Sequence, residues 1–300
     1  MTPRRIVVGS RESALAVAQA MTVVDFLRDA LPGVEIRLLT LKTTGDRILN
    51  RTLDRVGGKG LFVKELDEAL QDGRADIAVH SLKDVPSEIP ASLPLLGFSR
   101  RENPRDALVL PLGVQSLNPA LPIGSASPRR QLQLRTLFPG CDVRPVRGNV
   151  QTRLRKLDAG EFGALVLAAA GLKRLGLQSR VSRYFTTAEM IPAAGQGILA
   201  VQGRAGEDYS YLDAYFDPDA HAAATCERAF VAELDGGCTS PVCAFACVDA
   251  GKLHLRGLYY EEHAGRYRVG EASGDSADAV LLGTSLAREL RCGGGKEYIV

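Results

Sequence analysis

Lys83 and Asp84 place a cation beside a carboxylate within residues 80–86 (HSLKDVP). Residues 76–79 (DIAV), just before them, have the apolar, β-branched character of a short buried strand. The proline that ends the segment disfavours helix at the residue before it, so we expect the chain to leave the strand extended or turning. Ligand crevices in open α/β sheets form at the carboxyl ends of strands. The pair could therefore perform acid–base chemistry on a charged substrate; a solvated surface pair is the alternative.

Three strand-to-helix turns carry arginine, at residues 9–13 (GSRES), 124–130 (GSASPRR) and 147–153 (RGNVQTR). We expect Ser127 and Asn149 to cap the second and third helices. Backbone N–H groups and the helix dipole favour anions at such ends, and a guanidinium group can bind a carboxylate through two hydrogen bonds. The turns predict an anion site for phosphate or carboxylate. The sequence has no Walker A loop and no GxGxxG after a strand, which favours a polycarboxylate.

Cys238 follows two glycines in residues 235–238 (DGGC). Glycine permits positive φ, so the turn could project the thiol from the backbone. No histidine lies nearby in the sequence to activate the thiol for repeated turnover. A one-time covalent attachment of a substrate or cofactor fits better. A buried structural thiol is the alternative.

Cys238, Cys243 and Cys247 are close in sequence, but the chain has no CxxC pair and its histidines show no ligand spacing. Residues 241–249 have the pattern of a strand. Cys243 and Cys247 would then lie on one face, about 13 Å apart, too far to bind one metal ion. We predict no metal site and expect both cysteines in the core.

The composition is that of a globular protein of two or three domains, with 300 residues, 45% hydrophobic and 24% charged. The net charge of +2 argues against a general nucleic-acid binder. The sequence shows neither a signal-peptide core nor an apolar run of transmembrane length, so we predict a cytoplasmic protein that does not bind membranes. A chain trimmed of a transit peptide would look the same and is the alternative.

The hydrophobic pattern up to residue 216 alternates strands and helices, which is typical of α/β folds. The pattern changes from residue 218. A helix at 221–234 precedes three consecutive strands, and a last helix follows; these later elements are predicted at 242–248, 253–260, 267–272 and 276–290. Consecutive strands with flanking helices predict a small α+β domain with a three-stranded antiparallel sheet.

Nine segments, taken in order, resemble the hydroxymethylbilane synthase family, also called porphobilinogen deaminase. They are residues 9–16 (GSRESALA), 57–62 (GGKGLF), 80–86, 103–107 (NPRDA), 129–131 (RRQ), 147–150 (RGNV), 170–175 (AGLKRL), 192–197 (PAAGQG) and 236–238 (GGC). The resemblance extends along essentially the whole chain.

The resemblance implies two α/β lobes like those of type II periplasmic binding proteins, followed by the small α+β domain. Domain 1 would comprise residues 1–99 and 194–216, domain 2 residues 100–193, and domain 3 residues 217–300. It also implies a monomeric transferase of tetrapyrrole and haem biosynthesis. Such an enzyme adds four porphobilinogen molecules to a dipyrromethane cofactor, loses ammonia each time, and releases hydroxymethylbilane by hydrolysis.

The resemblance also implies a role for each matching residue. Asp84 would be catalytic, Cys238 would carry dipyrromethane as a thioether, and Lys59 would lie in a lid. The other cofactor-binding residues would be Ser81, Lys83, Ser125, Ser127, Arg129, Arg130, Arg147, Arg153 and Arg174. The substrate would be bound by Arg11, Ser13, Gln19, Arg147 and Arg153, because each pyrrole carries an acetate and a propionate.

One departure concerns the cofactor loop. Thr239 and Ser240 stand where the family usually has Gln-Val before a proline. The glycine turn and the thiol remain, so we expect attachment to survive.

Two other functions are alternatives to the interpretation as an enzyme. A non-catalytic, two-lobed polycarboxylate-binding protein would account for the arginines but gives no reason for Asp84 or for Cys238. An RNA-binding protein is disfavoured by the low net charge and by the lack of aromatic-rich basic segments.

Overall fold

The computed structural model describes residues 5–43, 63–235 and 241–299. Its contacts divide the chain into two compact units. The first unit contains Met1–Arg101 and Ile198–His221, and the second contains Glu102–Gly197 and Ala222–Val300. This division groups the second and third predicted domains, so the three-domain boundaries stay a prediction. No helix in the described part of the chain is long and apolar enough to cross a membrane.

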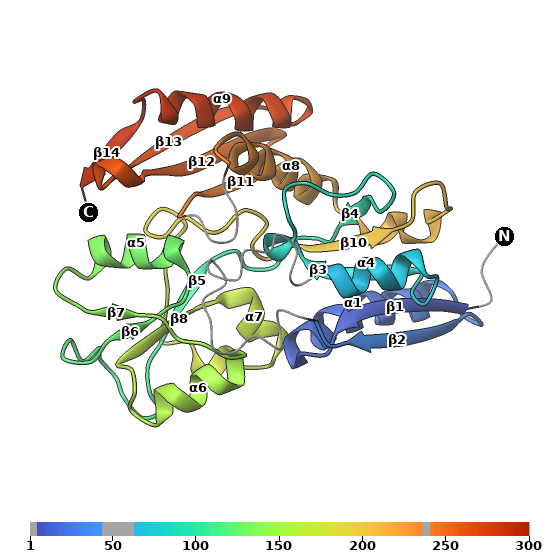
Figure 1. Cartoon of the computed structure of the whole chain (residues 1–300), viewed down its shortest axis with the longest axis horizontal. Coiled ribbons are helices and arrows are strands. Elements are labelled where there is room, and N and C mark those ends of the chain that lie inside the picture. The colour runs from blue at the N-terminus through green and yellow to red at the C-terminus, as the bar shows by residue number, and fades with distance from the viewer. Residues whose placement is uncertain (1–4, 44–62, 236–240, 300) are drawn as a thin grey trace. The chain divides into compact units, whose positions relative to one another are not determined.

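The first unit is built on a five-stranded sheet with the order β2-β1-β3-β10-β4 (Figure 1). β1 is parallel to both β2 and β3, whereas β10 is antiparallel to β3 and β4. The strands are β1 (Arg5–Arg11), β2 (Glu35–Leu41), β3 (Ile77–Ser81), β4 (Leu95–Phe98) and β10 (Leu199–Gly203). The late strand β10 therefore pairs within a sheet whose other strands all precede residue 99.

Helices α1 (Ala14–Ala30) and α4 (Lys64–Gln71) pack on opposite faces of this sheet. Side chains alternate between the two faces along a strand. Ile77 and Val79 of β3 accordingly belong to the core that contains the buried side of α1, while Ala78 belongs to the core beneath α4. This alternation also sends His80 and Ser81 to opposite faces at the end of β3.

The second unit contains a five-stranded sheet with the same pattern of neighbours, β7-β6-β8-β5-β9. β6 is parallel to β7 and β8, and β5 is antiparallel to β8 and β9. The strands are β5 (Asp106–Val109), β6 (Ile123–Gly124), β7 (Val143–Arg144), β8 (Ala164–Ala168) and β9 (Arg183–Tyr184). The helices that follow these strands along the chain are α5 (Pro128–Leu137), α6 (Val150–Asp158) and α7 (Ala169–Arg174).

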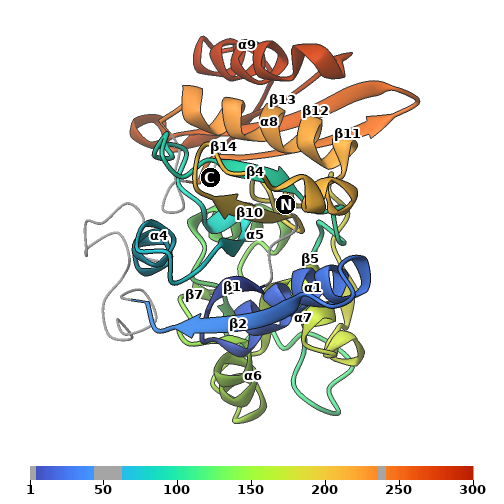
Figure 2. The ribbon, with the colours of Figure 1, turned by 90° about the vertical axis from the view of Figure 1, so that its right-hand side faces the viewer.

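A separate antiparallel sheet, β11-β12-β13-β14, completes the second unit. Helices α8 (Pro218–Glu233) and α9 (Ala279–Arg291) contribute to the core on one of its faces, and Figure 2 shows both helices beside this sheet. The strands are β11 (Cys243–Asp249), β12 (Lys252–Glu261), β13 (Arg266–Asp275) and β14 (Lys296–Ile299). The short 3₁₀ helices among the described residues are η1 (Leu82–Asp84), η2 (Gln178–Arg180), η3 (Ser210–Tyr215), η4 (Glu262–Ala264) and η5 (Ser276–Asp278).

The predicted fold class is confirmed, with two corrections in this last sheet. It has four strands rather than three, because the short strand β14 pairs with β13 after a run of glycines. The expectation that Cys247 lies in the core is wrong. Cys243 is fully buried in a cluster with Leu132 of α5, whereas Cys247, near the β11–β12 turn, is exposed.

Candidate active site

Asp84 stands at the carboxyl end of the central strand β3, as predicted. The strand ends at Ser81 and continues directly into the 3₁₀ turn η1, which contains Lys83 and Asp84. Val85 then returns to extended backbone, with φ −82° and ψ 130°, as expected for a residue before proline. Ser81, Lys83 and Asp84 are all half-buried. The carboxylate is therefore held on a short ordered turn and remains partly accessible.

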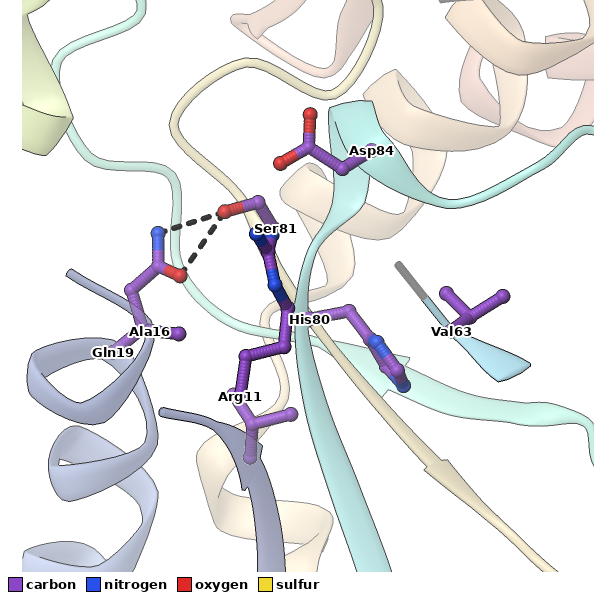
Figure 3. Close-up of a pocket in the computed structure, with 8 residues that line it drawn as sticks. Arg11, Ala16, Gln19, Val63, His80, Ser81 and Asp84 are labelled. Atoms are coloured by element: carbon purple, nitrogen blue, oxygen red, sulfur yellow. Dashed lines mark hydrogen bonds between the residues drawn. The ribbon is translucent and has the colours of Figure 1, made fainter. Parts of the chain in front are cut away.

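A small open pocket brings Asp84 together with three other predicted site residues of the first unit (Figure 3). Its lining residues are Arg11, Ala16, Gln19, Val63, Val79, His80, Ser81 and Asp84. Gln19 comes from α1 and is 5% exposed, and its amide N and O lie 2.8 and 3.0 Å from Ser81 Oγ. This pair fixes the wall of the pocket between α1 and β3.

The β1–α1 turn, for which the sequence predicts an anion site, contributes Arg11 to this pocket. Arg11 is the last residue of β1 and is half-buried. Ser13 is the N-cap of α1, and its Oγ accepts a hydrogen bond from Ala16 N at 3.3 Å. The helix N-terminus and the guanidinium group thus lie in one short segment, which suits a carboxylate.

His80 lines the same pocket, and the sequence reasoning missed it. The ring is fully buried and its Nε2 lies 3.0 Å from Gln202 Oε1 of β10. Burial lowers the pKa of His80 to about 4, although the bond to Gln202 opposes this shift. The imidazole is therefore neutral at pH 7. The pairing joins residues 122 positions apart, so only the β3–β10 register could have revealed it.

The second unit holds a corresponding turn at the start of α5. Ser127 is the N-cap and Pro128 the first helical residue, as predicted. Ser127 makes no side-chain cap hydrogen bond; its backbone N–H instead donates to Ser125 Oγ at 3.3 Å. Ser125 itself is 1% exposed. This hydrogen bond therefore links Ser125 and Ser127 at the start of the helix.

Arg129 and Arg130, on the first turn of α5, are buried against a carboxylate that the sequence reasoning did not single out. Arg129 Nη1 lies 2.7 Å from Asp106 Oδ2, and Arg130 Nη2 lies 2.7 Å from Asp106 Oδ1. The side chain of Asp106 is 0% exposed. Burial alone would raise the pKa of Asp106, but the two guanidinium groups hold it well below its usual range. The pair is thus fixed by an ionised carboxylate inside the protein.

Arg147 and Arg153 lie at the start of α6, whose N-cap is Asn149. Asn149 Oδ1 accepts a hydrogen bond from Thr152 N at 2.9 Å, which confirms the predicted cap. Gly148 has φ +109°, and a Cβ there would come within 2.7 Å of Thr152. Only glycine fits this turn, and its carbonyl oxygen accepts a hydrogen bond from Arg153 Nε at 2.7 Å.

Arg174 ends helix α7 and is half-buried. Its Nη2 donates to Gly197 O at 2.8 Å. The arginine is thereby linked to the turn at residues 192–197, which precedes β10.

The donor set of the second unit fits a ligand that carries carboxylates. Guanidinium groups and hydroxyls at helix starts are the donors that carboxylates prefer. Arg129 Nε is buried and has no hydrogen-bond acceptor within the described ranges. Leaving a buried charged donor unsatisfied is costly, and a ligand carboxylate would satisfy it. Two predicted groups, Lys59 and Cys238, lie outside the described residues.

Comparison with known proteins identifies the family. The family model "Porphobilinogen deaminase, dipyromethane cofactor binding domain" matches residues 6–211, and the model "Porphobilinogen deaminase, C-terminal domain" matches residues 221–291. Porphobilinogen deaminase of Ruminiclostridium cellulolyticum is 51% identical over 287 residues, covering 96% of this chain and 98% of that protein. Porphobilinogen deaminase of Chromobacterium violaceum is 46% identical over 299 residues, covering 98% and 97%.

Among solved structures, the periplasmic aliphatic sulphonate binding protein SsuA from Escherichia coli is similar with a TM-score of 0.42 and 13% identity, covering 78% of this chain and 71% of that one. This likeness carries no functional information. The two family models together cover most of the sequence, and the relatives match along nearly their whole length. The chain belongs to the porphobilinogen deaminase family.

Proposed function

We propose that this chain is a hydroxymethylbilane synthase in which Asp84 is the catalytic acid–base group. The enzyme is a transferase of tetrapyrrole biosynthesis. It condenses four porphobilinogen molecules head to tail, with loss of one ammonia at each step, and releases hydroxymethylbilane by hydrolysis. The observation that carries the assignment of Asp84 is its position, half-buried on the turn that ends β3, in a pocket shared with Arg11, Gln19 and Ser81.

Asp84 has two tasks in this account. Its carboxylate hydrogen-bonds the pyrrole N–H of the substrate and stabilises the cation that forms when the substrate loses ammonia. It also donates a proton to the departing amino group and accepts the proton that leaves the α-carbon of the attacking pyrrole. A carboxylate at a partly enclosed site suits both tasks, because its charge is only weakly screened there.

The neighbours of Asp84 hold the substrate. Arg11, Ser13 and Gln19 bind the acetate and propionate groups near the start of α1, and Lys83 adds a cation on the turn of Asp84. Arg147 and Arg153 bind further carboxylates from the second unit. Binding these remote groups orients the reacting carbon without taking part in bond making.

Dipyrromethane, when bound through Cys238, supplies the primer to which the first substrate is joined. We propose that Ser81, Lys83, Ser125, Ser127, Arg129, Arg130, Arg147, Arg153 and Arg174 hold its carboxylates. The buried, unsatisfied Nε of Arg129 supports this role. The alternative of a non-catalytic polycarboxylate-binding protein is not supported, because the matched family model is that of the cofactor-binding domain.

Intact mass spectrometry tests the covalent primer. Protein made in cells that synthesise porphobilinogen should be heavier than its sequence by one dipyrromethane, and Cys238→Ser should abolish the excess. Cys243→Ser is the matched control and should keep it, because Cys243 is a buried core thiol. An unmodified mass for the wild-type chain would contradict the proposal.

We further propose that the enzyme acts as a monomer in the cytoplasm, without nucleic-acid or membrane partners. Sedimentation of the purified holoenzyme tests the oligomeric state. A mass of about one chain at working concentration is expected, and a stable dimer would contradict it.

A further inference from the structure

Asp106 is surrounded by four hydrogen-bond donors from three side chains of the second unit. Its Oδ1 accepts from Arg130 Nε and Nη2, at 2.9 and 2.7 Å, and from Gln196 Nε2 at 3.1 Å. Its Oδ2 accepts from Arg129 Nη1 at 2.7 Å. The carboxylate is 0% exposed. It is therefore a fully buried acceptor whose bonds are nearly all charge-assisted.

Each guanidinium group is also fixed by a second acceptor. Arg129 Nη1 donates to Ile191 O at 2.7 Å, and Arg130 Nη1 donates to Val166 O at 3.1 Å. A planar guanidinium group that binds two acceptors in different directions has little freedom left to rotate. Asp106 is the acceptor that both arginines share, so it sets their positions relative to one another.

The burial of both arginines depends on this carboxylate. Their side chains are 5% and 9% exposed, and burying a guanidinium group without a counter-charge is strongly unfavourable. The arginines hold the pKa of Asp106 well below its usual range despite its burial. Asp106 is therefore ionised at neutral pH.

We propose that Asp106 is a positioning residue for assembly of the holoenzyme: it holds Arg129 and Arg130 in their binding positions before dipyrromethane arrives. This inference rests on the proposed role of the two arginines toward the carboxylates of dipyrromethane. Asp106 itself does not touch the ligand. Its contribution is preorganisation, which strengthens binding by removing the cost of ordering the donors.

The test uses the full chain made in cells unable to synthesise porphobilinogen, to which porphobilinogen is then added at graded concentrations. Intact mass gives the fraction of chains that carry the primer. For Asp106→Asn we expect the half-maximal concentration to rise about tenfold, equivalent to about 1.4 kcal/mol. The matched control is Leu290→Ala, which removes a buried core side chain in α9. An unchanged half-maximal concentration for Asp106→Asn would overturn the inference, as would an equal rise in the control.

A double-mutant cycle separates positioning from a merely structural role. Arg129→Lys alone should also raise the half-maximal concentration, and adding Asp106→Asn should then raise it by much less than about tenfold. Effects that multiply would show that Asp106 acts independently of Arg129 and would overturn the inference. An unchanged half-maximal concentration for Arg129→Lys would contradict the proposed role of this arginine in binding dipyrromethane. If Arg129→Lys impairs assembly and Asp106→Asn does not, only the present inference fails.

A milder variant keeps the test valid if Asp106→Asn does not fold. Gln196→Ala removes one donor from Asp106 Oδ1 and leaves both guanidinium groups in place. We expect a rise of about threefold in the half-maximal concentration, because one neutral hydrogen bond contributes less than a charged one. No rise for this variant would count against the inference.

Discussion

The two five-stranded sheets share one pattern of neighbours but place their important carboxylates differently. In the first unit, Asp84 follows the central parallel strand β3 and is half-buried beside a pocket. In the second unit, Asp106 begins the antiparallel strand β5 and is fully buried between two arginines. A carboxylate that must exchange protons with a substrate needs access, whereas one that holds other groups in place needs enclosure. The same sheet pattern therefore supports chemistry in one unit and preorganisation in the other.

The N-termini of helices α1 and α5 also differ between the two units. Ser13 caps α1 with its own side chain, whereas Ser127 caps α5 without a side-chain hydrogen bond. The turn in the first unit is capped from within its own segment by Ser13, and Glu12 N also donates to Leu41 O of β2 at 3.0 Å. The turn in the second unit is held by bonds from Arg129 and Arg130 to distant elements. Substitutions in both units test this contrast.

The largest effect is expected at Asp84. Asp84→Asn should lower turnover of porphobilinogen by about a hundredfold or more, because an amide can neither accept the proton nor stabilise the cation by charge. Steady-state kinetics measures the effect. Glu88→Gln is the control, since Glu88 is an exposed carboxylate in the same loop. Near-normal turnover in Asp84→Asn would remove Asp84 from catalysis.

The next effect concerns the stability of the second unit. Asp106→Ala leaves two buried guanidinium groups without their shared carboxylate and should lower the free energy of unfolding by about 3–5 kcal/mol. Asp142→Ala removes an exposed ion-pair partner of Arg144 and should lower the free energy of unfolding by about 1 kcal/mol or less. Denaturant unfolding compares the two. Equal losses would show that burial does not distinguish these ion pairs.

A third prediction uses the pH dependence of His80. Its pKa is about 4 in the folded protein, against an ordinary value of 6.5. As the pH drops from 6.5 to about 4, the unfolded chain protonates the imidazole before the folded chain does. The free energy of unfolding therefore falls across this pH range. As the pH falls from 6.5 to about 4, we expect the free energy of unfolding of the wild type to decrease by about 3 kcal/mol more than that of His80→Gln. Chemical denaturation at a series of pH values measures it, and parallel curves would contradict it.

The carboxylate of the second unit should respond in a different pH range. The pKa of Asp106 is lowered from an ordinary value of 3.8, so its contribution is fully present above about pH 5 and is lost progressively as the pH falls from there. Comparing wild type with Asp106→Asn should reveal no difference in slope between about pH 6.5 and about pH 5.5.

The smallest effect is expected at the two caps. Ser13→Ala removes a side-chain cap of α1 and should lower the free energy of unfolding by about 1 kcal/mol. Ser127→Ala removes no such bond and should cost less than about 0.5 kcal/mol. Thermal unfolding of the two variants checks the order, and a larger loss at Ser127 would reverse the comparison.

The features that local sequence controls could be predicted. The caps at Ser127 and Asn149 and the turn after β3 follow from residues within a few positions of one another. The dense series of motifs identified the family, which the comparisons confirm.

Features that depend on distant pairing could not be predicted. Asp106 meets its arginines across 23 and 24 positions, and the hydrophobic pattern of β5 gives no sign of them. The burial of His80 depends on β10, and Cys247 is exposed although the strand pattern places it on the same face as the buried Cys243. The strand β14 is four residues long, too short to show a periodic pattern.

One measurement tests the division of labour most directly: the intact masses of Asp84→Asn and Asp106→Asn, each made without porphobilinogen and then exposed to the same limiting concentration of it. We predict that Asp84→Asn carries the primer at the wild-type fraction, while Asp106→Asn carries it at a clearly lower fraction. Primer loss in Asp84→Asn together with full occupancy in Asp106→Asn would contradict the account.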